Sequence, residues 1–240
     1  MLSQTLSQIE SVLAADTAEA ASRRFFDALS PLGATYLQTR IYRRPRAVLT
    51  SEAHWAAGGL VARIAPDGWV GSDAFNYVCF ECNPLLGAIR ESRTRYRFSD
   101  FAAHGDRAFG AYWDAMGEAG IGDALCATSY GSGRAIASLH LGFSRRDFDD
   151  AEARAIHLAG LMLTERLMEF AEPAEEEPAL TARERDCLAF VADGRTDWEI
   201  AVLLGISEAT IRFHLNNARR KLGAVNRAQA VARFASRGLM

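Results

Sequence analysis

Lysine is almost absent from this chain of 240 residues, because Lys221 is the only one among its 27 lysine and arginine residues. A phospho-receiver domain needs a lysine beside an acidic cluster and a phosphorylatable aspartate. The absence of lysine from residues 1–220 therefore excludes a phospho-receiver domain there. Long apolar runs are absent too, since charged residues interrupt each one well before the roughly 20 residues of a membrane-spanning helix.

Cysteine is scarce, and its four residues in a chain of this length do not make a disulfide framework. The first residues, Met1-Leu2-Ser3-Gln4, lack the basic region and apolar core of a signal peptide. From these absences we expect a cytoplasmic protein with no membrane partner.

Patterns of catalytic residues are also missing: no Ser/His/Asp set, paired carboxylates or phosphate-cradling loop stands out, and Gly131-Ser132-Gly133 is typical of a turn. Cys79 and Cys82 form a lone C-x-x-C pair. Zinc would need two more ligands at fitting spacing, which His104 and Cys126 do not provide. The sequence predicts no enzyme, no metal and no cofactor, and leaves a redox sensor built on Cys79 and Cys82 as an alternative.

Charge is distributed unevenly along the chain. Residues 180–240 hold ten basic and six acidic side chains, a net charge of +4, whereas residues 1–179 hold seventeen and twenty-four, a net charge of −7. A basic segment attached to an acidic body favours contact with phosphates at one end only.

Residues 171–179 form the clearest boundary, because two prolines bracket an acidic run that has no apolar periodicity. We expect a first domain at residues 1–170, a linker at 171–179 and a second domain at 180–240.

The first domain alternates helix-like and strand-like stretches. Apolar residues at steps of three and four predict a long helix over 149–170, and the first thirty residues are also helix-like. β-branched and aromatic residues, with turn signals between them, indicate strands. The sum predicts an α+β domain, an antiparallel sheet sandwiched by helices. The predicted strands lie at 34–42, 47–50, 95–98, 125–130 and 135–143, and further helices at 51–64 and 106–119.

The second domain has the start and stop signals of four short helices. Thr181 and Thr196 each precede a glutamate by three residues, the spacing of a capping box, and Ser207 and Asn226 also stand where N-caps are needed. Glycines mark the helix ends, because glycine turns easily through the left-handed region. A turn of only three residues, 205–207, joins the middle pair, which predicts an all-α domain with a helix-turn-helix unit.

Ser207–Leu222 is the expected recognition helix of that unit. Arg212 and Asn216 are one helical turn apart near its first half. An arginine can bond guanine bidentately and an asparagine adenine, each pairing contributing about 1–3 kcal/mol of discrimination. The basic residues that end the helix suit phosphates; they are Arg219, Arg220 and Lys221.

These residues resemble the LuxR-type DNA-binding domain. The resemblance rests on a pattern that runs from Leu180-Thr181 through Ile206-Ser207 and Thr210-Ile211 to Lys221-Leu222. It implies a transcriptional regulator that binds double-stranded DNA as a homodimer at an inverted repeat, with RNA polymerase as a further candidate partner. It also implies base-facing positions at Arg212, Phe213 and Asn216, a DNA-contacting Thr210, and a dimer contact near the last helix, 227–237.

The first domain resembles the acyl-homoserine-lactone-binding domain of the quorum-sensing branch of that family. By this resemblance an apolar effector would contact Trp69, Tyr77, Asn83 and Phe98. The family places an aspartate where Asn83 stands, and a neutral amide accepts a weaker hydrogen bond from a ligand N–H than a carboxylate does. The alternatives are therefore a related apolar effector, a ligand-independent regulator and the redox sensor named above.

Overall fold

The computed structural model describes residues 10–45, 48–171 and 180–235. The chain divides into two compact units, residues 1–171 and residues 172–240. Apart from Ala171, the predicted linker lies outside the described residues.

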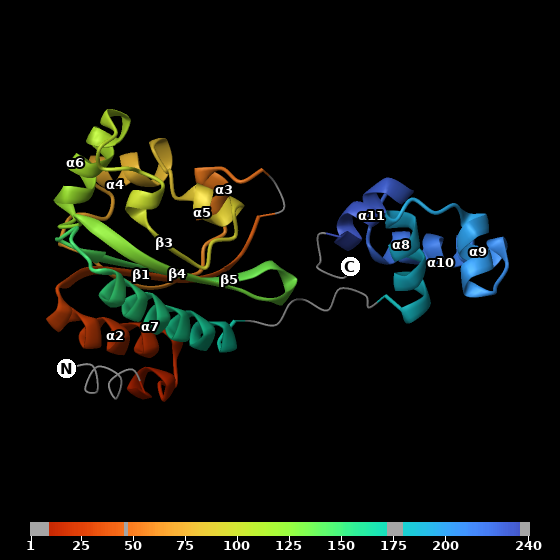
Figure 1. The fold of residues 1–240 in the computed structure, drawn as a ribbon, viewed down its shortest axis with the longest axis horizontal. Coiled ribbons are helices and arrows are strands. Elements are labelled where there is room, and N and C mark those ends of the chain that lie inside the picture. Colours follow the sequence, from red (N-terminus) through yellow and green to blue (C-terminus); the bar gives the residue numbers. More distant parts are fainter. Residues whose placement is uncertain (1–9, 46–47, 172–179, 236–240) are drawn as a thin grey trace. The chain divides into compact units, whose positions relative to one another are not determined.

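The first unit is built on a five-stranded antiparallel sheet with the strand order β2-β1-β5-β4-β3 (Figure 1). Tyr130 pairs with Ile136 on either side of the predicted turn at 131–133, so the two flanking strands form an antiparallel hairpin. The strands are β1 (Ala34–Arg43), β2 (Leu60–Ile64), β3 (Arg95–Arg97), β4 (Asp123–Tyr130) and β5 (Ala135–Phe143).

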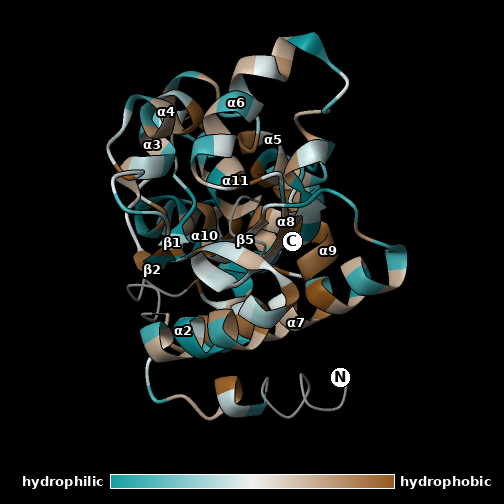
Figure 2. Ribbon diagram, turned by 90° about the vertical axis from the view of Figure 1, so that its left-hand side faces the viewer, coloured by the Kyte–Doolittle hydropathy of each residue, from teal (hydrophilic) through white to brown (hydrophobic). Residues whose placement is uncertain are grey.

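Helices cover both faces of this sheet, which confirms the α+β sandwich (Figure 1). One face packs against α2 (Ala18–Leu29) and α7 (Asp150–Glu169), and hydrophilic and hydrophobic residues alternate around both helices (Figure 2). The other face is covered by α3 (Ser51–Ala56), α4 (Asp73–Asn76), a π-helical turn (Tyr77–Glu81), α5 (Leu86–Arg90) and α6 (Gly110–Glu118).

The alternation of side chains along β1 produces two different cores. Leu37 joins an aliphatic core that includes Leu139 and Leu163, beneath α2 and α7. Tyr36 belongs to a core rich in aromatic residues on the opposite face, together with Trp113. Each layer of helices therefore packs on its own core, and the aromatic one adjoins the candidate site.

Two of the predicted elements were wrong. Residues 51–64 do not form one helix: α3 ends at Ala56, and β2 begins at Leu60 after Gly58 and Gly59, which both adopt positive φ. The predicted strand at 47–50 has no counterpart in residues 48–50, because the Thr50 side chain accepts a hydrogen bond from the Ala53 N–H and caps α3.

The second unit contains α8 (Ala182–Ala192), α9 (Asp197–Leu204), α10 (Glu208–Lys221) and α11 (Arg227–Ala235). Both predicted capping boxes are present, and the side chains of Ser207 and Asn226 accept the expected hydrogen bonds from Thr210 N and Gln229 N. The four-helix prediction is confirmed over the described residues; the end of the last predicted helix, from residue 236, lies outside them.

The conformation of Gly205 makes the short turn between α9 and α10 possible. Gly205 has a φ of +65°, and its N–H bonds back to Ala201 and Val202 carbonyls. An L-residue reaches that region with difficulty, so glycine allows α9 to stop and α10 to start within three residues. In the described part of the chain, no helix combines the length and apolar character needed to cross a bilayer.

Candidate functional site

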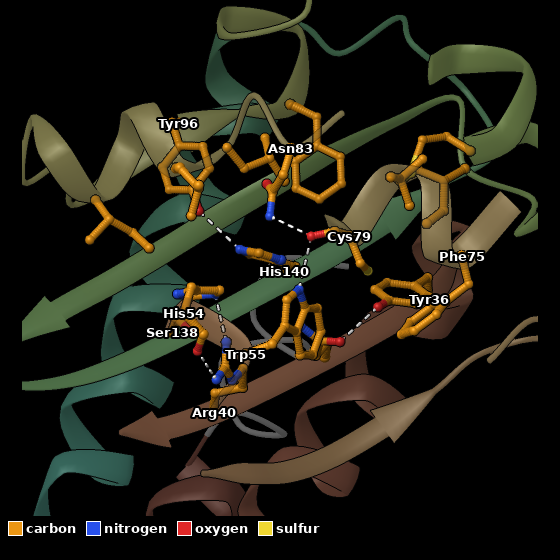
Figure 3. A pocket seen from close by; sticks show the side chains of 18 of the residues that line it. Tyr36, Arg40, His54, Trp55, Phe75, Cys79, Asn83, Tyr96, Ser138 and His140 are labelled. Atoms are coloured by element: carbon orange, nitrogen blue, oxygen red, sulfur yellow. Dashed lines mark hydrogen bonds between the residues drawn. The ribbon is translucent and has the colours of Figure 1, made fainter. Parts of the chain in front are cut away.

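A cavity lies between the sheet of the first unit and its layer of short helices (Figure 3). It offers about 70 Å³ to the centres of water molecules, several times the roughly 10–15 Å³ that one water needs. Its wall combines aliphatic, aromatic and polar side chains, the usual composition of a small-molecule site. Every second residue of one stretch of β1 supplies one side of it, namely Tyr36, Gln38, Arg40 and Tyr42.

Arg40 is the most deeply buried charged residue of the wall, with 2 % of its surface exposed. Its Nη2 donates to the carbonyls of His54 at 2.9 Å and Gly58 at 2.6 Å, and its Nε donates to the Gly58 carbonyl at 3.1 Å. Its guanidinium carbon also lies 4.5 Å from the ring centroid of Tyr42 and 4.9 Å from that of Trp55. Burial lowers the pKa of Arg40, but a guanidinium still stays protonated.

His54 lies directly against this guanidinium. Arg40 Nη1 is 2.6 Å from His54 Nε2, and since a guanidinium only donates, Nε2 must accept and the imidazole proton must be on Nδ1. Burial and the Arg40 charge lower the pKa of His54 to about 3. The imidazole is therefore neutral at physiological pH.

His140 is the second histidine of the wall, and its Nε2 lies 2.9 Å from the Tyr96 hydroxyl. Burial and the nearby Arg40 lower its pKa to about 4. Neither histidine thus adds charge to the cavity near neutral pH, and both serve as neutral hydrogen-bonding groups.

The Cys79 carbonyl organises the helical side of the cavity. It accepts one hydrogen bond from Trp55 Nε1 at 3.1 Å and another from Asn83 Nδ2 at 3.1 Å (Figure 3). Asn83 is thereby held by its amide nitrogen, a contact that an aspartate at the same position could not make.

Three of the four residues expected around an effector line this cavity: Trp69, Asn83 and Phe98. Tyr77, the fourth, is not among the lining residues and belongs to the π-helical turn. The prediction also missed Arg40, His54 and His140. The alternation of β1 was a usable signal for Arg40, because it places every second residue of that strand on one face.

The C-x-x-C pair does not form a disulfide, since Cys79 and Cys82 are both free thiols. Burial raises the pKa of the Cys79 thiol to about 12, which leaves almost no nucleophilic thiolate near neutral pH. Within the described residues, no group of three or more histidines, cysteines or carboxylates could hold a metal ion.

In the second unit, α10 presents a polar outer face. Arg212, Phe213 and Asn216 are exposed on it, Phe213 with 61 % of its surface. Arg212 makes only a surface ion pair with Glu208, at 3.4 Å, which costs little to exchange for another partner. An exposed aromatic ring between polar groups fits a contact surface better than a core position.

The three basic residues at the end of α10, predicted at phosphates, make contacts within the second unit. Lys221 Nζ lies 2.8 Å from Glu184 Oε2, so its ammonium has a partner inside the unit. Arg219 donates to the carbonyls of Ala224 and Val225 at 3.4 and 3.3 Å. Arg220 bonds the side chain of Asn217 and stays exposed. Thr210, also expected at DNA, lies 2.8 Å from Ser207 Oγ through its hydroxyl.

Comparison with protein families finds a match for the second unit. The model of bacterial regulatory proteins of the luxR family matches residues 178–234. The transcriptional activator VanR of Vibrio anguillarum is 38 % identical over 90 residues, which cover 35 % of this chain and 38 % of VanR. The quorum-sensing-dependent regulator RpaR of Rhodopseudomonas palustris is 40 % identical over 95 residues, which cover 39 % of each protein. The chain thus spans well under half the length of both relatives.

Solved structures extend the likeness of fold to the first unit. SdiA of Escherichia coli has a TM-score of 0.62 at 21 % identity, covering 99 % of this chain and 98 % of that one. CepR2 of Burkholderia cenocepacia has a TM-score of 0.51 at 18 % identity, covering 72 % of this chain and 98 % of that one. Both share the sheet-and-helix architecture described above.

Proposed function

Since residues 178–234 belong to the luxR family of bacterial regulatory proteins, we propose that this chain is a cytoplasmic transcriptional regulator. In this proposal residues 1–170 bind a small effector in the cavity, residues 171–179 link the domains, and residues 180–240 bind DNA.

The DNA-binding half of the proposal is supported by α10. Its outer face exposes Arg212, Phe213 and Asn216, two of which have the donor geometry that reads base edges. The resemblance to the LuxR-type DNA-binding domain implies a protein that binds double-stranded DNA as a homodimer, and residues 178–234 match the model of that family. We therefore propose a homodimer on an inverted-repeat operator, in which Arg220 contacts phosphate and RNA polymerase is a partner at the promoter.

The effector half is carried by one observation, the buried cavity beside the sheet with its mixed apolar and polar wall. The two proteins of similar fold have small-molecule ligands: CepR2 is described as N-acylhomoserine lactone dependent, and SdiA was solved in complex with octanoyl-rac-glycerol. A cavity of this kind can couple a signal to DNA, because an effector that binds one arrangement of the chain better shifts the population toward it.

The test is to identify what the cavity binds and whether DNA binding depends on it. The full chain is purified and examined by native mass spectrometry. Operator fragments are then selected from genomic DNA twice, once with the protein as purified and once with protein from which any copurifying small molecule has been removed. We expect a copurifying small molecule whose removal changes operator affinity. Tight operator binding that is indifferent to its removal would favour a ligand-independent regulator instead.

The redox alternative has its own test in Cys79→Ser. Because the Cys79 thiol is partly buried and its pKa is raised to about 12, we expect operator binding by wild type and variant to respond equally little to a thiol oxidant. A wild-type response that the variant loses would support the redox sensor.

A further inference from the structure

The cavity carries positive charge and no matching negative charge. Its lining contains Arg40 but neither aspartate nor glutamate. Arg63 adds a second cation at its edge, with its guanidinium carbon 5.6 Å from the Trp55 ring centroid and 5.3 Å from that of Phe75, two rings that line the cavity. Within residues 10–45, 48–171 and 180–235, neither arginine forms an ion pair.

The partners of Arg40 are all neutral: two backbone carbonyls, one imidazole nitrogen and two aromatic faces. Such groups offset part of the cost of burying a cation, but a carboxylate would offset much more. The four hydrogen bonds use four of the five guanidinium N–H groups, so one N–H on Nη1 remains. The buried cation thus retains both charge and a donor for a ligand.

His54 offers a second donor. Its Nε2 accepts from Arg40, so its proton is on Nδ1. That nitrogen is buried and has no hydrogen-bond partner among the described residues, although leaving a buried donor unsatisfied is unfavourable. At a residue that lines a cavity, such a donor is available to an acceptor group of a ligand.

Asn83 removes the one negative charge that the family resemblance would place here. Its Nδ2 is held by the Cys79 carbonyl, so the residue contributes a neutral amide to the wall. The lining also contains aliphatic side chains, Val78, Leu86 and Ile89 among them, and these suit an apolar body. The cavity thus combines a cation and hydrogen-bond donors with apolar side chains in one wall.

From this juxtaposition we infer that the cavity recognises the carboxylate of an amphipathic organic acid, with Arg40 and His54 as the residues that select the head group. The inference rests on the proposed effector role of the cavity and adds the chemical class of the effector. It differs from a neutral acyl-homoserine lactone, whose amide N–H needs an acceptor.

The test compares carboxylates with their uncharged isosteres on the full-length protein at neutral pH. Straight-chain acids from butanoate to decanoate, and cinnamate as an aryl acid, are each paired with the primary amide of the same carbon skeleton and titrated by calorimetry. We expect the preferred acid to bind about tenfold or more tightly than its amide, the usual size of one charge-assisted hydrogen bond. Comparison of the straight-chain acids with cinnamate shows whether the apolar part of the ligand is alkyl or aryl.

Variants assign the effect to the head-group residues. Arg40→Gln should abolish the preference for acid over amide, whereas Arg95→Gln, which removes an exposed arginine of β3, should leave it intact. If Arg40→Gln does not fold, the acid–amide comparison in the wild-type protein still decides the question. Arg40→Gln protein that retained the preference would overturn the assignment to Arg40.

The remaining outcomes separate this inference from the proposed function. Amides that bind as tightly as acids, or a neutral copurifying ligand in the cavity, would overturn the carboxylate class and leave the effector role standing. Failure of every acid, together with the absence of any copurifying ligand and of any ligand effect on DNA binding, would overturn both.

Discussion

Lys221 Nζ lies 2.8 Å from Glu184 Oε2 and joins the end of α10 to the first turn of α8. The same oxygen accepts a hydrogen bond from the Thr181 N–H at 2.8 Å, as half of the capping box. Only 3 % of Glu184 is exposed, so its carboxylate depends on these partners. The single lysine of the chain thus supports the capping box at the start of α8.

Lys221→Met should therefore act on stability before it acts on DNA. A buried carboxylate that loses its cation keeps its desolvation cost, so we expect the free energy of unfolding of this domain to fall by about 1–3 kcal/mol. Denaturant unfolding followed by far-ultraviolet circular dichroism measures the change. Arg220→Met is the matched control, since it removes an exposed neighbouring cation and should change stability by less than about 0.5 kcal/mol. Equal losses in the two variants would refute the role of the ion pair.

Acid should weaken the same contact. Burial alone would raise the pKa of Glu184, but the hydrogen bonds from Lys221 and Thr181 outweigh it, and the pKa in the folded protein is lowered. The contribution to stability is then complete above the unfolded pKa of about 4.3 and is lost as pH falls through the lower folded value. The stability difference between wild type and Glu184→Gln should shrink as pH is lowered from about 7 to about 3. A difference independent of pH would contradict this.

The helix caps were predictable from the sequence, and the partner of Lys221 was not. Capping boxes at Thr181 and Thr196 are local, because each unites residues only three positions apart. Glu184 and Lys221 are 37 positions apart, and their contact depends on how α8 packs against α10. Because the sequence does not show this packing, Lys221 was interpreted only as a basic residue at the end of a recognition helix, and so as a phosphate contact.

The cavity shows the same division. The resemblance to a known family indicated Trp69, Asn83 and Phe98, which line it, and also Tyr77, which does not. Arg40 and His54 were missed because their contact requires β1 and α3 to pack together, and the region of α3 was itself predicted as one long helix. Local apolar spacing could not reveal the break at the two glycines before β2.

The outer face of α10 yields a prediction about specificity. Arg212→Ala should weaken operator binding and relax base preference at one position by about 1–3 kcal/mol, as expected when a bidentate base contact is lost. Arg220→Ala should reduce affinity for all sequences alike and lower the slope of log affinity against log salt by about one. Selection from randomised DNA, followed by salt titration, separates the two effects. A loss of base preference in both variants would show that the two positions have been assigned wrongly.

Gly58 and Gly59 offer a matched pair for the region beside Arg40. Both have positive φ, at +65° and +74°. A Cβ at Gly59 would lie 1.8 Å from the Ile41 carbonyl oxygen, whereas a Cβ at Gly58 would meet nothing within 4 Å. Gly58→Ala should cost about 1–2 kcal/mol of stability from backbone strain alone. Gly59→Ala should cost clearly more and disturb ligand binding, because the β1 backbone must move; thermal unfolding of the two variants measures this, and similar melting temperatures would argue against the close contact.

Asn83→Asp tests the chemistry of the cavity from the side opposite to Arg40→Gln. The change removes the N–H that bonds the Cys79 carbonyl and introduces a carboxylate that can accept from a ligand N–H. We expect the preference for acids over amides to fall by about tenfold, and the affinity for acyl-homoserine lactones to rise, because the new charge repels a carboxylate and attracts an amide. Asn83→Ala removes the same hydrogen bond without adding charge, so it should weaken both ligand classes alike. If Asn83→Asp also weakened both alike, position 83 would only support the wall, and the head group would be selected elsewhere.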